Sequence, residues 1–316
     1  MPDVGKAGLA AFMVSVLSIP FIIPLLRRLK FGQQVREDGP ASHLAKSGTP
    51  TMGGLVFMLA IPAAMVWAGA YAVKSLLAVF LILAMGSLGF LDDFLKIRRK
   101  NADGLSKRQK MAGQILAGTV FGTALWWLDG GRIWLPVLGL YLDLGIGYIP
   151  LAVFIICATA NGVNFTDGVD GLCSGVTFIV ALAYLLLCRA HGLEELVWLA
   201  AGLAGSCLGF LCFNLHPAKL FMGDTGSLAL GGAVSALALL SDTALLLPVL
   251  GIVYVAEVLS VILQTRYFQY TGGKRLLRMA PLHHHFELSG WSENQVGFAF
   301  WSVTLMAAAL FLWITV

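Results

Sequence analysis

Long apolar segments alternate with short polar ones along the whole 316-residue chain. Windows of 18 or more mostly apolar residues recur along its whole length, and such a window is long enough to cross a hydrocarbon core of ~30 Å. We therefore predict about ten membrane-spanning helices, near 7–26, 53–72, 76–94, 110–128, 147–162, 175–190, 195–213, 226–241, 245–266 and 297–315. The longest polar stretch is too short for a soluble domain. The expected fold is a single all-α, polytopic integral-membrane domain over residues 1–316.

The composition supports this interpretation. Hydrophobic residues make up 58% of the chain and charged residues only 12%, against about a quarter charged in soluble domains. A soluble fold, a disordered chain and a nucleic-acid-binding protein are therefore excluded. The five cysteines form no CxxC pair, so neither a redox motif nor a zinc site is indicated. The first apolar run is too long for the core of a signal peptide, so we expect no cleaved leader.

The distribution of basic residues predicts the orientation. When the predicted spans alternate sides, 17 of the 21 Lys and Arg residues fall in loops on one face. The positive-inside rule makes that face cytoplasmic and places both termini on the periplasmic side. The acidic residues and histidines discussed below fall on the same face, so we expect chemistry at the cytoplasmic surface of the membrane.

Asp92 and Asp93 lie at the predicted end of the third span, in the string GFLDDFLKIRRK. Two adjacent carboxylates are electrostatically unfavourable at a helix C-terminus, where the macrodipole is negative. A bound metal ion would explain them, and so would a solvated helix end balanced by the basic residues that follow. Neighbouring side chains on a helix diverge by about 100°, so we expect one metal ligand and one base or orienting group.

The segment NGVNFTDGVDGLCSG, residues 161–175, holds two acids, two amides and four glycines between two predicted spans. Glycines allow the backbone to approach a ligand closely. Asp167 and Asp170 would share a face if the segment were helical. A plain connecting turn needs fewer such residues, so the segment favours a ligand-binding role over a purely structural one.

Asp224 stands just before the eighth predicted span, in FMGDTGS. A helix N-cap would be a sufficient explanation for one Asp. However, Asn214, His216 and Lys219 lie shortly before it, on the same face as the other acids. This grouping favours a functional site.

The run His283–His284–His285 lies in the last cytoplasmic loop, within PLHHHFE. The chain has no HExxH motif, so a zinc protease is not indicated. Three successive side chains cannot all bind one ion comfortably. We expect one or two of the rings to contact a phosphate or a carboxylate, and the others to pack against them.

Two further segments carry weaker signals. Lys46 and Thr51 belong to a Gly- and Thr-rich string before the second span, which a turn and helix start would also explain. Glu257 lies inside the ninth span, where ionisable residues are costly and usually functional or paired. Gln264, seven residues on, shares its helix face, and interhelical hydrogen bonding would account for both.

Together these groups favour phosphoryl transfer. Carboxylates and Gly-rich turns suit Mg²⁺, which prefers oxygen ligands and often bridges substrate phosphates. Lysines and histidines would neutralise phosphate charge. The residues alone therefore predict Mg²⁺-dependent transfer between a soluble phosphate compound and a membrane lipid. A transporter is the rival hypothesis, but its polar residues would be expected near the middle of the bilayer.

The strings GTPTMGG, GFLDDFLK, NGVNFTDGVDGL, FNLHPAKLFMGDTGSLALGG and PLHHHFE closely resemble, in order, the motifs of the phospho-N-acetylmuramoyl-pentapeptide transferases. That family belongs to the polyprenyl-phosphate N-acetylhexosamine-1-phosphate transferases. The resemblance implies that undecaprenyl phosphate attacks UDP-N-acetylmuramoyl-pentapeptide, with Mg²⁺ required, giving lipid I and UMP. The PLHHHFE string resembles the muramoyl branch, and a UDP-N-acetylglucosamine-specific transferase is the alternative within the superfamily.

The resemblance also implies roles for individual residues. The metal would be held by Asp224 and Asp92. Catalysis would involve Asp92, Asp93, Asp224 and His283. Substrate binding would involve Lys46, Thr51, Lys96, Lys110, Asn164, Asp167, Asp170, Asn214, Phe221, Gln264, His284 and His285. Members of the family are typically homodimers in the bacterial cytoplasmic (inner) membrane, so we expect the same here.

Overall fold

The computed structural model describes residues 4–29, 31–32, 48–99, 104–136 and 138–316. The first eight helices in chain order are α1 (Val4–Arg28), α2 (Leu55–Trp67), α3 (Val73–Arg99), α4 (Lys107–Asp129), α5 (Tyr148–Thr166), α6 (Leu172–Ala190), α7 (Glu194–Asn214) and α8 (Gly223–Leu240). They are followed by α9 (Leu247–Leu250), α10 (Ile252–Tyr270), α11 (Leu282–Glu287) and α12 (Glu293–Thr315). A β-hairpin of β1 (Arg132–Leu135) and β2 (Leu140–Asp143) connects α4 to α5.

The helices agree with the predicted membrane architecture. Among the described residues, eight helices are long and apolar enough to cross a membrane, and the bent pair α9–α10 forms a ninth candidate. Helix α2 is also apolar but has only 13 residues. These segments overlap the predicted spans one by one and in order. The protein is therefore a polytopic, mostly helical membrane protein.

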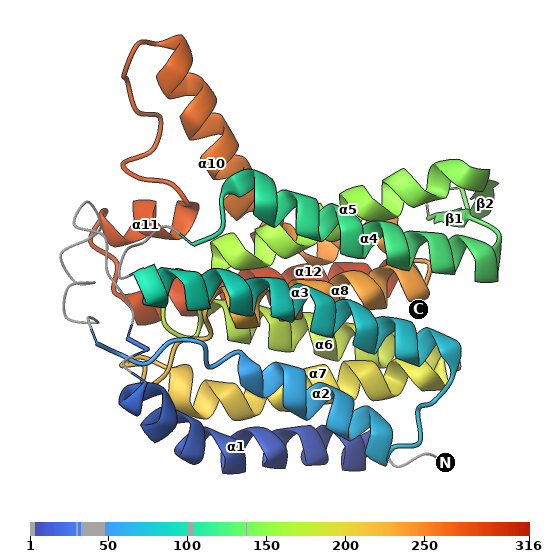
Figure 1. Ribbon diagram of the computed structural model, residues 1–316. Helices are drawn as coiled ribbons and strands as arrows, with labels where there is room; N and C mark the ends of the chain where they lie inside the picture. The colour runs from blue at the N-terminus through green and yellow to red at the C-terminus, as the bar shows by residue number, and fades with distance from the viewer. Residues whose placement is uncertain (1–3, 30, 33–47, 100–103, 137) are drawn as a thin grey trace.

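Helix α8 lies at the centre of the bundle, between α3 and α5 (Figure 1). Its apolar window is 89% buried, whereas that of α1 is only 22% buried. The sequence of α8 is rich in Gly, Ala and Ser, which allow helix backbones to approach closely in a membrane. A Cβ on Gly231 would lie 2.5 Å from the Cα of Ala160 in α5. This close packing holds α8 against α5.

The ninth predicted span, near 245–266, is not one straight helix. It is broken at Gly251, and α10 turns by 81° from the segment before it. Helix α10 projects away from the bundle, and the chain returns from its tip to α11 (Figure 1). Hydrophobicity alone predicted a continuous span because the break changes the direction of the backbone and leaves the apolar character unchanged.

The β-hairpin is not predicted by the sequence pattern. Its strands pair antiparallel with Arg132 opposite Asp143 and Leu135 opposite Leu140. Strands of four residues are too short to show a clear alternating pattern. The hairpin lies at the end of the bundle where both termini are found, and α11 lies at the opposite end (Figure 1).

Candidate active site

Three carboxylates come together between α3 and α8. Asp92, Asp93 and Asp224 each offer an oxygen, and these oxygens all lie within 4.8 Å of one another. The approach of the two helices explains how they meet, because a Cβ on Gly89 would lie only 2.0 Å from the carbonyl oxygen of Asp224. A glycine is therefore needed where α3 crosses the first turn of α8.

The helix positions of these acids differ from the prediction. Helix α3 continues to Arg99, so Asp92 and Asp93 lie within it and not at its C-terminus. The apolar pattern stops near residue 94 because the last two turns are basic and polar. The N-cap of α8 is Met222, and Asp224 lies in the first turn. The capping interpretation of Asp224 is therefore wrong, but the positive helix end still favours its carboxylate.

Adjacent Asp92 and Asp93 have different surroundings, as expected for neighbours on a helix. Asp92 Oδ1 accepts a hydrogen bond of 2.7 Å from the backbone N–H of Leu105. Asp93 Oδ2 accepts from both the backbone N–H and the hydroxyl of Thr225, at 2.9 and 2.8 Å. Both carboxylates are buried. Asp92 is thus fixed by the segment that leads into α4, and Asp93 by α8.

Two lysines neutralise most of the negative charge. Lys96 Nζ lies 2.6 Å from Asp92 Oδ2, 3.0 Å from Asp224 Oδ2 and 3.7 Å from Asp93 Oδ1. Lys110, at the start of α4, lies 2.8 Å from Asp224 Oδ2. Three carboxylates therefore face two ammonium groups. The remaining negative charge favours the entry of a further cation.

Helix α5 also contacts Asp224, through the side chain of Asn164. The amide Nδ2 of Asn164 donates to Asp224 Oδ1 and lies equally close to Ser227 Oγ, both at 2.8 Å. Asp224 is consequently held by residues of α3, α4 and α5. The predicted residues Asp92, Asp93, Lys96, Lys110, Asn164 and Asp224 form one contiguous cluster.

The donors of this cluster fit Mg²⁺. All three candidate ligands are carboxylates. Mg²⁺ is a hard cation that binds oxygen ligands, and it usually leaves several of its coordination positions to water and substrate phosphates. A second acidic group, Asp170 with His216 and Glu293, has ligand atoms equally close together. It contains an imidazole, which suits transition metals better. The carboxylate cluster is therefore the better candidate for magnesium.

Thr51 lies next to the carboxylates. A Cβ on Gly223 would lie 2.9 Å from Thr51 Oγ1 and 2.5 Å from Asp93 Oδ2, so both side chains border the same point of the α8 turn. The backbone of Phe221 pairs with this segment, donating to Pro50 O at 2.9 Å and accepting from the N–H of Gly53 at 2.8 Å. Lys46, predicted in the same string, lies outside the described residues.

The segment with Asp167 and Asp170 is a turn between two helices. Helix α5 ends at Thr166 and α6 begins at Leu172, so the two acids do not share a helix face. Asp167 is the C-cap of α5. Asp170 Oδ2 lies 3.0 Å from His216 Nδ1 and accepts from the N–H of Ala218 at 3.0 Å. Asp170 therefore ties this turn to the α7–α8 loop.

Asn214, the last residue of α7, also joins the α5–α6 turn to the α7–α8 loop. Its Oδ1 accepts hydrogen bonds from the N–H of Gly171 and the hydroxyl of Ser174, at 3.2 and 3.0 Å. Its Nδ2 donates to Leu220 O at 3.0 Å. The buried amide thus fixes the α5–α6 turn against the α7–α8 loop. Glu293, which the sequence pattern does not mark as a site residue, also belongs to this region: its Oε2 accepts a hydrogen bond of 3.1 Å from the N–H of Asp170.

The three histidines have three different environments. His283 is only 1% exposed, and its Nδ1 lies 3.1 Å from Glu257 Oε1. A Cβ on Gly168 would lie 2.1 Å from His283 Nε2, so the ring packs under the turn between Asp167 and Asp170. His284 Nδ1 lies 2.7 Å from Glu287 Oε2. The third ring, His285, accepts a hydrogen bond of 3.1 Å at Nδ1 from the backbone N–H of Arg278.

Glu257 and Gln264 both hold the chain that returns from the tip of α10. Glu257 Oε2 accepts from the N–H of Leu282 at 2.7 Å. Gln264 Oε1 accepts from the N–H groups of Leu276 and Leu277, and its Nε2 donates to Leu277 O. Their predicted location on one helix face is confirmed. Their bonds join α10 to the backbone of one segment and do not link two spanning helices.

These features define a class of protein. The chain matches the family model of glycosyl transferase family 4 over residues 75–242, a range that contains the whole carboxylate–lysine cluster. It is thus a membrane glycosyl transferase of that family. Residues 46–58, which include Thr51, match signature 1 of the phospho-N-acetylmuramoyl-pentapeptide-transferases.

Individual relatives make the assignment more specific. The phospho-N-acetylmuramoyl-pentapeptide-transferase of Heliobacterium modesticaldum is 49% identical over 306 residues, covering 96% of this chain and 95% of the relative. That of Moorella thermoacetica is 49% identical and covers 96% of both chains. That of Clostridioides difficile is 44% identical and covers 98% and 95%. The chain belongs to the phospho-N-acetylmuramoyl-pentapeptide transferase family.

Proposed function

We propose that this protein transfers phospho-N-acetylmuramoyl-pentapeptide from its UDP derivative to undecaprenyl phosphate. A phosphate oxygen of the lipid forms a new bond to the β-phosphorus of the nucleotide, and the bond from that phosphorus to the bridging oxygen breaks. The products are lipid I and UMP. The observation that carries this proposal is the cluster of three carboxylates and two lysines at one end of the bundle.

Each residue of the cluster has a role in this proposal. Asp92 and Asp224, which both contact Lys96, would hold the cation. Mg²⁺ bound there would neutralise charge on the diphosphate during displacement. Asp93, oriented by Thr225, would accept the proton of the lipid phosphate. Lys96 and Lys110 would exchange carboxylate contacts for contacts with substrate phosphates.

The residues around the cluster would bind the nucleotide and the sugar. The turn with Asp167 and Asp170, the loop with Phe221, and the segment with Thr51 all border the carboxylates or one another. The proposed substrate-binding residues are Lys46, Thr51, Lys96, Lys110, Asn164, Asp167, Asp170, Asn214, Phe221, Gln264, His284 and His285. His283 is proposed as a further catalytic residue, positioned by Glu257.

The proposal places the protein in the bacterial cytoplasmic membrane as a homodimer. The basic ends of α1 and α3 and the basic start of α4 support an orientation with the cluster at the cytoplasmic surface and both termini outside. A soluble nucleotide would reach the cluster from the cytosol. The lipid would approach from the bilayer.

UMP release tests the proposal. The purified protein would be given undecaprenyl phosphate and Mg²⁺ with either UDP-N-acetylmuramoyl-pentapeptide or UDP-N-acetylglucosamine. We expect release with the muramoyl nucleotide and none after EDTA treatment. Release with the glucosamine nucleotide alone would assign the chain to the sister activity. A folded protein inactive with both would contradict transferase activity and favour transport.

A further inference from the structure

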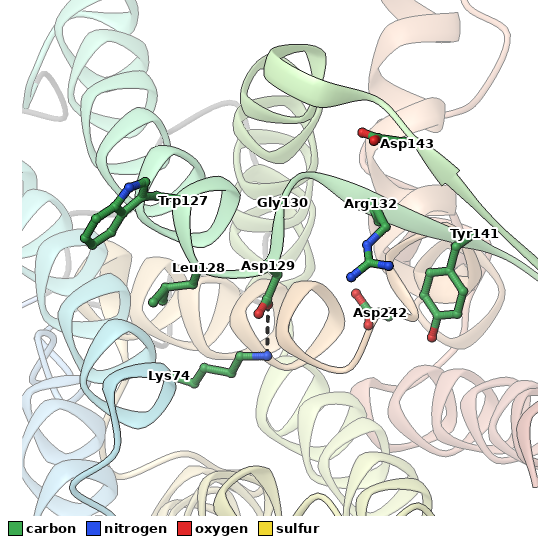
Figure 2. A pocket seen from close by; sticks show the side chains of 9 residues that line it. All are labelled: Lys74, Trp127, Leu128, Asp129, Gly130, Arg132, Tyr141, Asp143 and Asp242. Atoms are coloured by element: carbon green, nitrogen blue, oxygen red, sulfur yellow. Dashed lines mark ion pairs between the residues drawn. The ribbon is translucent and has the colours of Figure 1, made fainter.

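A polar cavity lies at the opposite end of the bundle from the carboxylate cluster. It has a volume of about 760 Å³ and is formed where α4, the hairpin and the turn after α8 meet (Figure 2). The lining residues are Lys74, Trp127, Leu128, Asp129, Gly130, Arg132, Tyr141, Asp143 and Asp242. A smaller cavity of about 410 Å³ adjoins it and shares Lys74, Tyr141 and Asp242.

This cavity is far from the proposed catalytic centre. On α3, Lys74 precedes Asp92 by 18 residues, about 27 Å at 1.5 Å per residue. Asp242, in the turn just after α8, follows Asp224 by the same number of residues. The two sites therefore lie near the two surfaces of the membrane, and the chemistry at one does not involve the other directly.

The charges of the cavity are only partly paired. Lys74 Nζ lies 2.9 Å from Asp129 Oδ2. The guanidinium of Arg132 points toward the carboxylate of Asp242 (Figure 2), but no ion pair joins them within the described part of the chain. Asp143 accepts a hydrogen bond from the N–H of Gly145. Three carboxylates and two cations thus face a common space, with capacity for both an anion and a cation.

Asp242 lies in an unusual backbone conformation, and the nearby cations do not fully offset the burial of its carboxylate. It has a positive φ of 58°, which L-residues rarely adopt and which Asp and Asn tolerate best. Burial raises the pKa of its carboxyl, which the cations Lys74 and Arg132 lower and the Asp129 charge raises further. An additional cationic group in the cavity would therefore favour the ionised form of Asp242.

The rim of the cavity is apolar and aromatic. Trp127 is 82% exposed and Tyr141 is 59% exposed, and Leu128 is exposed beside them. Trp and Tyr concentrate at membrane–water interfaces, where their rings lie at the level of lipid headgroups. The hairpin adds exposed Leu138 and Leu140. A ligand suited to this site has a zwitterionic head and an apolar tail.

We propose that this cavity binds a phospholipid whose headgroup carries a phosphate and a primary ammonium, of the phosphatidylethanolamine type. Arg132 and Lys74 would contact the phosphate, since guanidinium and ammonium groups are strong donors to it. Asp242 and Asp143 would accept hydrogen bonds from the ammonium. Trp127 and Leu128 would lie against the glycerol and the first carbons of the acyl chains. The proposal is independent of the activity proposed above.

Lipid binding to the purified protein tests this site. The delipidated full chain would be titrated with phosphatidylethanolamine or phosphatidylglycerol, and bound lipid counted by native mass spectrometry. We expect phosphatidylethanolamine to bind at least tenfold more tightly. Asp242→Asn, which keeps the tolerance for positive φ, and Arg132→Ala should each remove this preference. Arg189→Ala, at the same end of the bundle but outside the cavity lining, should retain it.

Three results would overturn the proposal. Equal affinity for the two lipids would exclude recognition of the ammonium. An unchanged preference in both cavity variants would place the lipid elsewhere. Equally tight binding of soluble phosphoethanolamine would make the ligand a soluble compound. UMP release should be unchanged in Arg132→Ala, and thermal unfolding of each variant verifies that it is folded.

Discussion

Asp93 and Thr225 are joined by two hydrogen bonds, which connect the C-terminal half of α3 to the first turn of α8. One carboxylate oxygen of Asp93 accepts from the backbone N–H of Thr225 at 2.9 Å and from its hydroxyl at 2.8 Å. Both residues are buried. The second oxygen, Oδ1, stays on the side of Lys96, 3.7 Å away. Thr225 therefore determines which oxygen of Asp93 faces the cluster.

Replacing Thr225 tests this orientation. Thr225→Val keeps the shape and the backbone donor but removes the hydroxyl, and a hydrogen bond to a charged group contributes about 1.5–3 kcal/mol. We expect turnover to fall by about ten- to a hundredfold, because 1.4 kcal/mol corresponds to a factor of ten. Thr225→Ser keeps the donor and should retain most activity. Equal UMP release from the two variants would contradict a role for the hydroxyl.

Asp224 is expected to be far more sensitive. Asp224→Asn removes one charge from a group contacted by Lys96, Lys110 and Asn164, and weakens any cation held there. A metal contributes several kcal/mol to such a transition state, so turnover should fall by orders of magnitude, as EDTA should also cause. Glu194→Gln, an equivalent change at the other end of the bundle, serves as the control. Near-normal UMP release from folded Asp224→Asn would refute the metal-binding role.

Gly89 tests how the two helices are brought together. A Cβ at this position would lie 2.0 Å from Asp224 O, so Gly89→Ala must push α3 away from α8. Overpacking of this kind costs about 1–3 kcal/mol, and the displacement separates the carboxylates. We expect a lower melting temperature together with a large loss of UMP release. Gly297→Ala, on α12, meets no atom within 4 Å and should change neither. Similar behaviour of both variants would exclude the close contact.

The sequence predicted the helices and the cluster well because both depend on local patterns. Apolar length located every spanning segment, and charge asymmetry put the acids and lysines on one face. Asp92 does come close to Asp224, and Lys96 and Lys110 both contact it. The sequence could not show that Lys96 joins carboxylates of two helices, because its contact with Asp224 depends on the close crossing of α3 and α8. Nor could it reveal the break at Gly251, since apolar character continues through it.

The role of Asp170 and Asn214 shows the same limit. The sequence predicted both to be polar site residues, but it could not show that their side chains bond to backbone and side-chain groups far away along the chain. Glu293 was overlooked because it begins a span, far along the chain from its partner Asp170. Long-range pairs of this kind leave no periodic signal in a single sequence. Local propensity therefore predicts which residues are polar and near a site, but not whether they contact substrate.

Glu257 and His283 provide the last test, since they form a buried pair far apart in sequence. Their facing atoms lie 3.1 Å apart, and both side chains are almost completely buried. If Glu257 positions the ring of His283 for catalysis, Glu257→Gln should reduce kcat/KM strongly in the otherwise unchanged protein. The same substitution should reduce it only slightly in a protein that already carries His283→Gln. Contacting residues typically show coupling energies of about 0.5–3 kcal/mol, and we expect more than about 1 kcal/mol. The double-mutant cycle is measured by UMP release, with melting temperatures as a check on folding. If the effects of the two substitutions on kcat/KM were strictly additive, the catalytic role of His283 would not depend on Glu257, and the pair would serve only the fold.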